Sequence, residues 1–132
     1  AMTARLVEEA GARAIATTSA GVAWAHGYPD GERIPRAAML DAVRVVVRAV
    51  RVPVTADVER GYGDGTPADA AETARGVIDA GAVGLNLEDA PGRDGAPMLA
   101  AEAQAERIAA VRDAARAAGV ALFINARTDA WV

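Results

Sequence analysis

The stretch VPVTADVE, residues 52–59, is an apolar run that ends in two carboxylates, Asp57 and Glu59. Such a run predicts a buried strand. Side chains alternate between the two faces of a strand, so residues two apart point to the same side. We therefore expect Asp57 and Glu59 to share one face at the end of this strand.

A second apolar run, AVGLNLE at residues 82–88, ends in Glu88, and Asn86 lies on the same predicted face. Carboxylates that are brought together without a Lys partner repel one another, so a positive charge has to offset them. Mg²⁺ prefers oxygen ligands and keeps several waters, which makes it the natural candidate. Together, the two strand ends predict a metal site.

A weak repeat organises the rest of the chain around these strands. VEEAG (7–11), VIDAG (77–81) and ARAAG (115–119) each end a helical pattern with Gly, the usual left-handed cap, and an apolar run follows each. A fourth unit, residues 40–59, enters its strand through Val-Pro instead. The pattern predicts helices near residues 3–10, 36–50, 67–80 and 100–118 and strands near 13–18, 52–57, 82–88 and 120–127.

The predicted strands are nearly continuous apolar runs, as in parallel sheets that are covered on both faces, and each ends in polar residues. Polar residues at the carboxyl ends of consecutive parallel strands are typical of the active sites of (β/α)₈ barrels. A doubly wound sheet uses the same edge, but the chain has no GxGxxG or P-loop motif. We therefore predict an α/β fold of the TIM-barrel type.

The length is about half of what such a barrel needs, because a complete barrel usually takes about 250 residues and this chain has 132. We expect a single domain, residues 1–132, that corresponds to roughly the first half of a barrel: four βα units, with the first strand missing. An open four-stranded sheet leaves two unpaired edges, which favour association. The chain is then either a fragment or completed by strands of another chain.

The composition argues against several classes of protein. The net charge is −4, there is no Lys, and the Arg residues form no basic stripe, so we expect no nucleic-acid partner. The absence of Cys excludes disulfides, thiolate metal sites and a Cys nucleophile. The apolar stretches fall well short of the ~20 residues that a bilayer requires, so we expect no membrane partner. With no signal peptide in view, a cytoplasmic protein is the expectation.

The motifs also match a family. DVERGYG (57–63) resembles the DxDxGYG motif of the isocitrate lyase/phosphoenolpyruvate mutase superfamily, with Glu59 where many members carry Asp, and LNLED (85–89) resembles its metal-proximal Glu. The other shared phrases, in the family's order, are ARLVEEAG (4–11), AIATTSAGVAWAHGYPDG (14–31) and FINARTDAW (123–131). The resemblance covers nearly the whole chain and is strongest to short bacterial members.

The resemblance implies a Mg²⁺ cofactor, with Mn²⁺ as the other candidate. Asp57 would bind the cation directly, while Glu59 and Glu88 would hold its water shell. Arg127 would bind the acidic group of a small anionic carboxylate substrate, and Asp30 would border the site as a second catalytic residue. The segment TTSAG would contact the substrate through Thr18, Ser19, Ala20 and Gly21. The resemblance also implies a homo-oligomer.

Family chemistry forms or breaks a C–C or P–C bond next to an α-keto acid through an enolate, whose charge Mg²⁺ stabilises as a Lewis acid. The lyase branch carries a loop with a Lys and a Cys general acid, but residues 90–98 read APGRDGAPM, with neither. Our first hypothesis is therefore a Mg²⁺-dependent carbon–carbon lyase or decarboxylase that acts on a small α-keto or 2-hydroxy acid without Cys chemistry. The alternatives are a phosphoenolpyruvate- or phosphonopyruvate-type mutase or hydrolase, and a truncated domain without catalytic activity.

Overall fold

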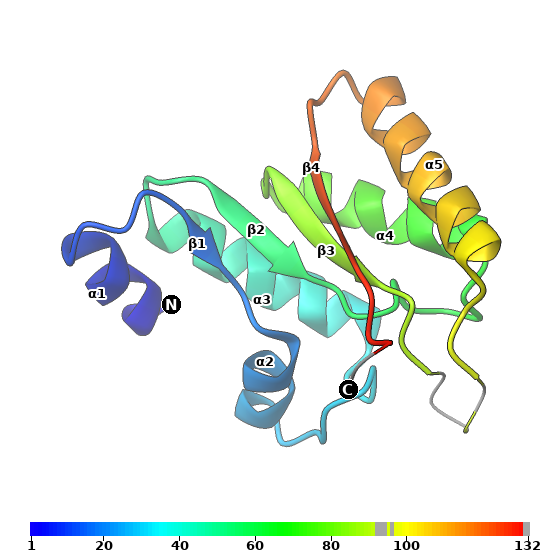
Figure 1. Cartoon of the computed structure of the whole chain (residues 1–132). Helices are drawn as coiled ribbons and strands as arrows, with labels where there is room; N and C mark the ends of the chain where they lie inside the picture. Colours follow the sequence, from blue (N-terminus) through cyan, green and yellow to red (C-terminus); the bar gives the residue numbers. More distant parts are fainter. Residues whose placement is uncertain (92–94, 96, 131–132) are drawn as a thin grey trace.

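The computed structural model describes residues 1–91, 95 and 97–130. Helices and strands alternate along these residues, except that two helices separate the first strand from the second (Figure 1). The helices are α1 (Met2–Glu9), α2 (Ser19–Ala25), α3 (Arg36–Ala49), α4 (Pro67–Asp79) and α5 (Ala101–Ala117). The strands are β1 (Ile15–Ala16), β2 (Val54–Asp57), β3 (Gly84–Glu88) and β4 (Phe123–Arg127).

The four strands form one parallel sheet in the order β1-β2-β3-β4, so strands that are consecutive in sequence are neighbours in space. Helices α1, α3, α4 and α5 contact β1, β2, β3 and β4 respectively, and α3 and α4 lie behind the sheet in Figure 1. The short α2 continues from the carboxyl end of β1. The helices therefore cover one face of the sheet, and all four strands end at the same edge.

The core lies between the sheet and the helix layer. Ala56, Val58, Leu85 and Leu87 point from the strands into it, and Val77 and Val111 meet them from the helices; all six are buried. The residues that alternate with them belong to the opposite face. This alternation places Asp57 on that opposite face, as the sequence predicts. Glu59 follows β2 in a turn with a φ of 52°, so strand alternation does not set its direction.

Local signals explain where the helices begin and end. Thr66 and Asp69 form a capping box at the start of α4, in which each side chain accepts the other's backbone N–H, and Pro67 occupies the first turn. Gly11, Gly81 and Gly119 follow α1, α4 and α5 with positive φ angles of 100°, 89° and 69°. The predicted left-handed glycine caps are thus confirmed.

The predicted helices and strands are all present, with ends that differ by a few residues. The sequence missed α2: Thr18 is its N-cap residue, so most of the TTSAG segment is helical rather than an open loop. The expected burial on both faces also fails at β4, where only Ile124 is partly buried and the other residues are exposed. Within the described residues, no helix combines the length and apolar character needed to cross a membrane.

Candidate active site

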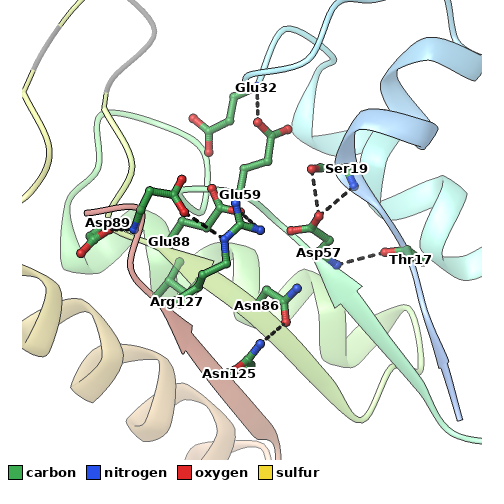
Figure 2. A network of polar contacts seen from close by, with 12 residues as sticks. Thr17, Ser19, Glu32, Asp57, Glu59, Asn86, Glu88, Asp89, Asn125 and Arg127 are labelled. Carbon is green, nitrogen blue, oxygen red and sulfur yellow. Dashed lines mark hydrogen bonds and ion pairs between the residues drawn. The ribbon is translucent and has the colours of Figure 1, made fainter. Parts of the chain in front are cut away.

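The carboxyl ends of β2, β3 and β4 bring charged side chains from three separate segments together (Figure 2). Asp57 ends β2, Glu88 ends β3 and Arg127 ends β4. The parallel register sets Glu88 directly opposite Arg127 and Asp57 opposite Asn86. Sheet topology alone therefore creates a site in which carboxylates face a guanidinium.

Asp57 is held on one side only. Its Oδ2 accepts hydrogen bonds from the backbone N–H of Ser19 at 3.0 Å and from the Ser19 hydroxyl at 2.9 Å, while its own N–H donates to the Thr17 hydroxyl at 3.0 Å. The side chain is buried, and its Oδ1 finds no hydrogen-bond partner among the described residues. A buried carboxylate oxygen without a donor is costly unless a ligand or water satisfies it.

Glu59 follows β2 and repeats this arrangement. Its Oε2 accepts the backbone N–H of Glu32 at 2.7 Å, its carbonyl accepts the N–H of Glu88 at 2.8 Å, and its Oε1 has no partner in the described chain. Burial raises the pKa of Glu59 from 4.5 to about 7; the Glu32 N–H lowers it, and the charges of Asp30, Glu32 and Glu88 raise it further. Glu59 is therefore a carboxylate that a nearby cation would help to ionise.

Glu88 and Arg127 form an ion pair, with Arg127 Nη1 at 2.7 Å from Glu88 Oε1. Arg127 Nε also lies 3.0 Å from Asp129 Oδ1, and this hydrogen bond raises the pKa of the guanidinium. Burial is the main cause that raises the pKa of Glu88 to about 7. Arg127 lowers this pKa, and the negative charges of Asp129, Asp57 and Asp30 raise it further. The site holds more acid than one Arg offsets.

A cavity of about 410 Å³ opens beside Glu59, Glu88 and Arg127, while Asp57 is not among its lining residues. Of the residues predicted from sequence, five line it: Ser19, Asp30, Glu59, Glu88 and Arg127. Thr18 and Gly21 instead line a separate, more apolar cavity of about 660 Å³ next to α1 and α3, and Ala20 lines neither. A substrate-binding role for Thr18, Ala20 and Gly21 thus stays a prediction. Unlike Ser19, these three residues do not line the cavity beside the carboxylates.

The donor set fits a cation that is bound mainly through water. In the part of the chain that the structure describes, no three His, Cys, Asp or Glu side chains form a group that could hold a metal ion. The two buried, unpartnered oxygens, Asp57 Oδ1 and Glu59 Oε1, are hard anionic donors of the kind Mg²⁺ prefers, and Mg²⁺ keeps several waters. The expected arrangement, one direct contact from Asp57 and water-mediated contacts from Glu59 and Glu88, therefore stays a prediction that the chemistry of the residues supports.

Sequence reasoning missed the residues that support the site from behind. Arg107 of α5 is 1% exposed; its Nη1 donates to the carbonyl of Glu88 at 3.2 Å and to Gln104 Oε1 at 2.7 Å, and Gln104 in turn donates to the carbonyl of Leu87. Gly61, at φ 91°, fits closely over it, since a Cβ there would lie 3.1 Å from Arg107 Nη2. Burial lowers the pKa of Arg107. The sequence did contain a signal for Arg107. It stands four positions before Val111, which is buried, and so lies on the core side of the same helix.

The comparisons with known proteins now decide the family. The family model described as phosphoenolpyruvate phosphomutase matches residues 1–132. This chain belongs to the phosphoenolpyruvate mutase family. A curated relative of this family member, the 2-methylisocitrate lyase of Bacillus subtilis (strain 168), is 31% identical over 135 residues, which cover 98% of the chain and 43% of the relative.

Solved structures agree with the family and with the fold. A protein from Burkholderia cenocepacia J2315, provisionally named a phosphonomutase, is 50% identical with a TM-score of 0.91, covering 97% of this chain and 51% of that one. Oxaloacetate acetylhydrolase bound to its product oxalate is 28% identical with a TM-score of 0.86, covering 98% and 45%. The chain thus spans about half the length of these relatives, and its four parallel βα units correspond to the first half of a TIM-type barrel.

Proposed function

We propose that this chain carries the cation-binding part of a Mg²⁺-dependent enzyme that cleaves a C–C bond of a small α-keto or 2-hydroxy carboxylic acid through an enolate. Mn²⁺ is the other candidate cation. The observation that carries the proposal is the pair of buried, unpartnered oxygens, Asp57 Oδ1 and Glu59 Oε1, at strand ends that also present Arg127. Such oxygens supply what a hard cation needs, and the Arg supplies what a carboxylate needs.

Each residue has a distinct task in this proposal. Asp57 contacts the cation, with the free oxygen fixed in place because Ser19 holds the other one. Glu59 and Glu88 accept hydrogen bonds from the cation's water ligands. Arg127 offers its planar fork to the substrate carboxylate after leaving one of its present acidic partners. When bound, Mg²⁺ would supply Lewis-acid stabilisation of enolate charge.

The relatives support this reaction class. One is named 2-methylisocitrate lyase, and a further structure, 27% identical with a TM-score of 0.84, is a 2,3-dimethylmalate lyase. Their names describe substrates that are small, branched carboxylic acids. Another relative was solved with oxalate as its product, and oxalate is a planar dianion that resembles an enolate. Oxalate is therefore a suitable probe for this site.

A second candidate is a mutase or hydrolase acting on a phosphoenolpyruvate- or phosphonopyruvate-like substrate. The 50% identity to a protein provisionally named a phosphonomutase favours it, as does the description of the matching family model. The sequence of the loop, APGRDGAPM, lacks the Lys and Cys of the lyase branch; residues 92–94 and 96 of this loop lie outside the described residues. Turnover of phosphonopyruvate but not of 2-methylisocitrate by the purified protein would favour this candidate over the lyase.

The proposal is tested by thermal melting with Mg²⁺ and oxalate added separately and together. A ligand present at 100 times its Kd and bound only by the folded form stabilises it by ~2.7 kcal/mol, which is readily seen as a higher Tm. We expect such a shift in the wild type and in Asp64→Ala, an exposed acid on the β2–α4 loop, and no shift in Asp57→Ala. An equal shift in Asp57→Ala would contradict the assignment of Asp57 to the cation site. No shift in the wild type or in either variant would favour a domain without catalytic activity.

A further inference from the structure

Three backbone positions beside the cavity adopt a conformation that side chains rarely take. Among the described residues, Glu32, Glu59 and Tyr62 are the non-glycine residues with positive φ, at 55°, 52° and 62°. Left-handed backbone is unfavourable for residues with a Cβ and persists only when surrounding contacts enforce it. The three belong to two loops that are far apart in sequence, so a common cause has to hold them.

Hydrogen bonds between the three residues supply that cause. The N–H of Glu32 donates to Glu59 Oε2 at 2.7 Å, and the N–H of Tyr62 donates to Glu32 Oε1 at 2.6 Å. Glu32 is 4% exposed, so both bonds are shielded from water. We call this three-residue arrangement, Glu32 with Glu59 and Tyr62, the glutamate clasp.

The clasp determines which oxygen of Glu59 remains available. Because the Glu32 N–H occupies Oε2, Oε1 is the oxygen left without a partner in the described chain. The carboxylate of Glu32, by binding the Tyr62 N–H, keeps its own loop against the turn that carries Glu59. Without that anchor, the Glu32 N–H would no longer be fixed over Glu59.

We infer that Glu32 is a positioning residue for the cation site: its carboxylate and N–H together orient Glu59 so that Oε1 is presented to the cation's water shell. This inference rests on the proposed function, because it presupposes that Mg²⁺ binds here. Outer-shell partners of metal ligands typically contribute about 10–100-fold to metal affinity. Glu32 contributes on that scale, although it does not touch the cation.

The test is calorimetric titration of the purified protein with Mg²⁺ for three Glu32 variants. Glu32→Ala removes the carboxylate, and Glu32→Gly does the same while relieving the strain of a φ of 55°. Both are expected to weaken Mg²⁺ binding about 10–100-fold, whereas Glu32→Gln, which still offers an oxygen to the Tyr62 N–H, retains most of the affinity. Agreement between Ala and Gly assigns the loss to the side chain and not to backbone strain.

Asp69→Ala is the matched control. Asp69, in the first turn of α4, is another carboxylate that accepts backbone N–H groups from the loop after β2, those of Asp64 and Thr66, but it lies outside the clasp. Its variant should melt at a lower temperature and bind Mg²⁺ as the wild type does. Equal weakening in Asp69→Ala would show that any loosening of this loop lowers affinity and would overturn a specific role for Glu32.

A second readout does not depend on the metal. Amide hydrogen exchange of Tyr62 should accelerate in Glu32→Ala and Glu32→Gly and stay slow in Glu32→Gln. Wild-type affinity in the Ala and Gly variants, or a Tyr62 amide that remains protected in them, overturns the inference while the proposed function stands. A wild type that does not bind Mg²⁺ overturns both.

Discussion

The end of β2 differs from the end of β4 in how it holds charge. Asp57 and Glu59 are 8% and 6% exposed, and each has one carboxylate oxygen fixed by a backbone N–H from a segment that is distant in sequence. Arg127 lies on an edge strand with its side chain 45% exposed, and side-chain ion pairs with Glu88 and Asp129 hold it. The acidic half of the site, Asp57, Glu59 and Glu88, is thus the buried half, and the cationic half, Arg127, is the exposed half.

This difference indicates how the two halves could work. Backbone donors fix Asp57 and Glu59 in advance, which suits a cation that demands regular geometry. An exposed Arg that is paired only with side chains can exchange one acid for another, because its guanidinium is open to water even though Glu88 is buried. We therefore expect changes in the buried half to affect folding and metal binding, and changes in the exposed half to affect anion binding.

The largest effect on stability is expected at Arg107, which supports the buried half from behind. Arg107→Ala removes a fully buried side chain and the donor to the carbonyl of Glu88, so it should lower the free energy of unfolding by about 3–5 kcal/mol. Arg107→Met, which retains most of the packing, should be less destabilising. Urea denaturation measures both.

Arg112→Ala is the control on the same helix. Arg112 also donates to a backbone carbonyl, that of Leu122, but is itself exposed, so its loss should cost only ~1 kcal/mol. If Arg107→Ala were no more destabilising than Arg112→Ala, the buried guanidinium would not support the end of β3.

The next effect concerns Arg127 in the exposed half. Arg127→Met should leave the free energy of unfolding within about 1 kcal/mol of wild type and weaken binding of oxalate in the presence of Mg²⁺ by at least about tenfold, since a charge-assisted bidentate contact is lost. Arg127→Lys should fall between the two, because Lys keeps the charge without the planar fork. Calorimetry gives the affinities, and Arg116→Ala, which breaks an exposed pair with Asp113, serves as the control. Unchanged oxalate affinity in Arg127→Met would contradict the proposed anion contact.

The acidic half also predicts an unusual dependence of stability on pH. Glu59 and Glu88 have pKa values of about 7 in the folded chain against an ordinary value of 4.5. Between these values the folded chain holds more protons than the unfolded chain, so their stabilising contribution is complete below pH 4.5 and is lost as the pH rises through about 7. Without metal, Tm should therefore fall across this window.

Two comparisons isolate that contribution. The double variant Glu59→Gln, Glu88→Gln should show a flatter Tm profile between pH 4.5 and 7, and Mg²⁺ should flatten the wild-type profile because it offsets the ionised carboxylates. The lowered pKa of Asp69 acts in the opposite direction, but only below its ordinary value of 3.8. A wild-type Tm that rises from pH 4.5 to 7 would show that the two glutamates are not held in a desolvated site.

Much of this organisation could be predicted from the sequence, because it follows from periodicity. Alternation along VPVTADVE puts Asp57 on the face opposite the core, and the glycines that end three of the helical phrases mark where β1, β3 and β4 begin. The polar strand ends and the chain length extended the prediction from single strands to half a barrel, and the family resemblance agreed with it. Both depend on local patterns that a single chain displays.

The remaining features depend on contacts between distant segments. Nothing in GYPDGE shows that Glu32 reaches the turn after β2, and its positive φ is a consequence of that contact and not of its residue type. In the same way, the sequence did not show that the N–H and hydroxyl of Ser19 donate to Asp57, while the substrate contact expected of Ser19 stays a prediction. Such partners become visible only when the strand ends are assembled.

The smallest expected effect lies between the two halves, where β3 meets β4. Asn125 Nδ2 donates to Asn86 Oδ1 at 2.9 Å across the face of the sheet that the helices do not cover. Asn125 is exposed, so water can replace the lost bond, and Asn125→Ala should lower the free energy of unfolding by only about 0.5–1 kcal/mol. The same variant should leave Mg²⁺ affinity unchanged, because this bond involves none of the site carboxylates. A loss of Mg²⁺ affinity in Asn125→Ala would mean that the position of β4 controls the acidic half, and that the two halves of the site are not independent.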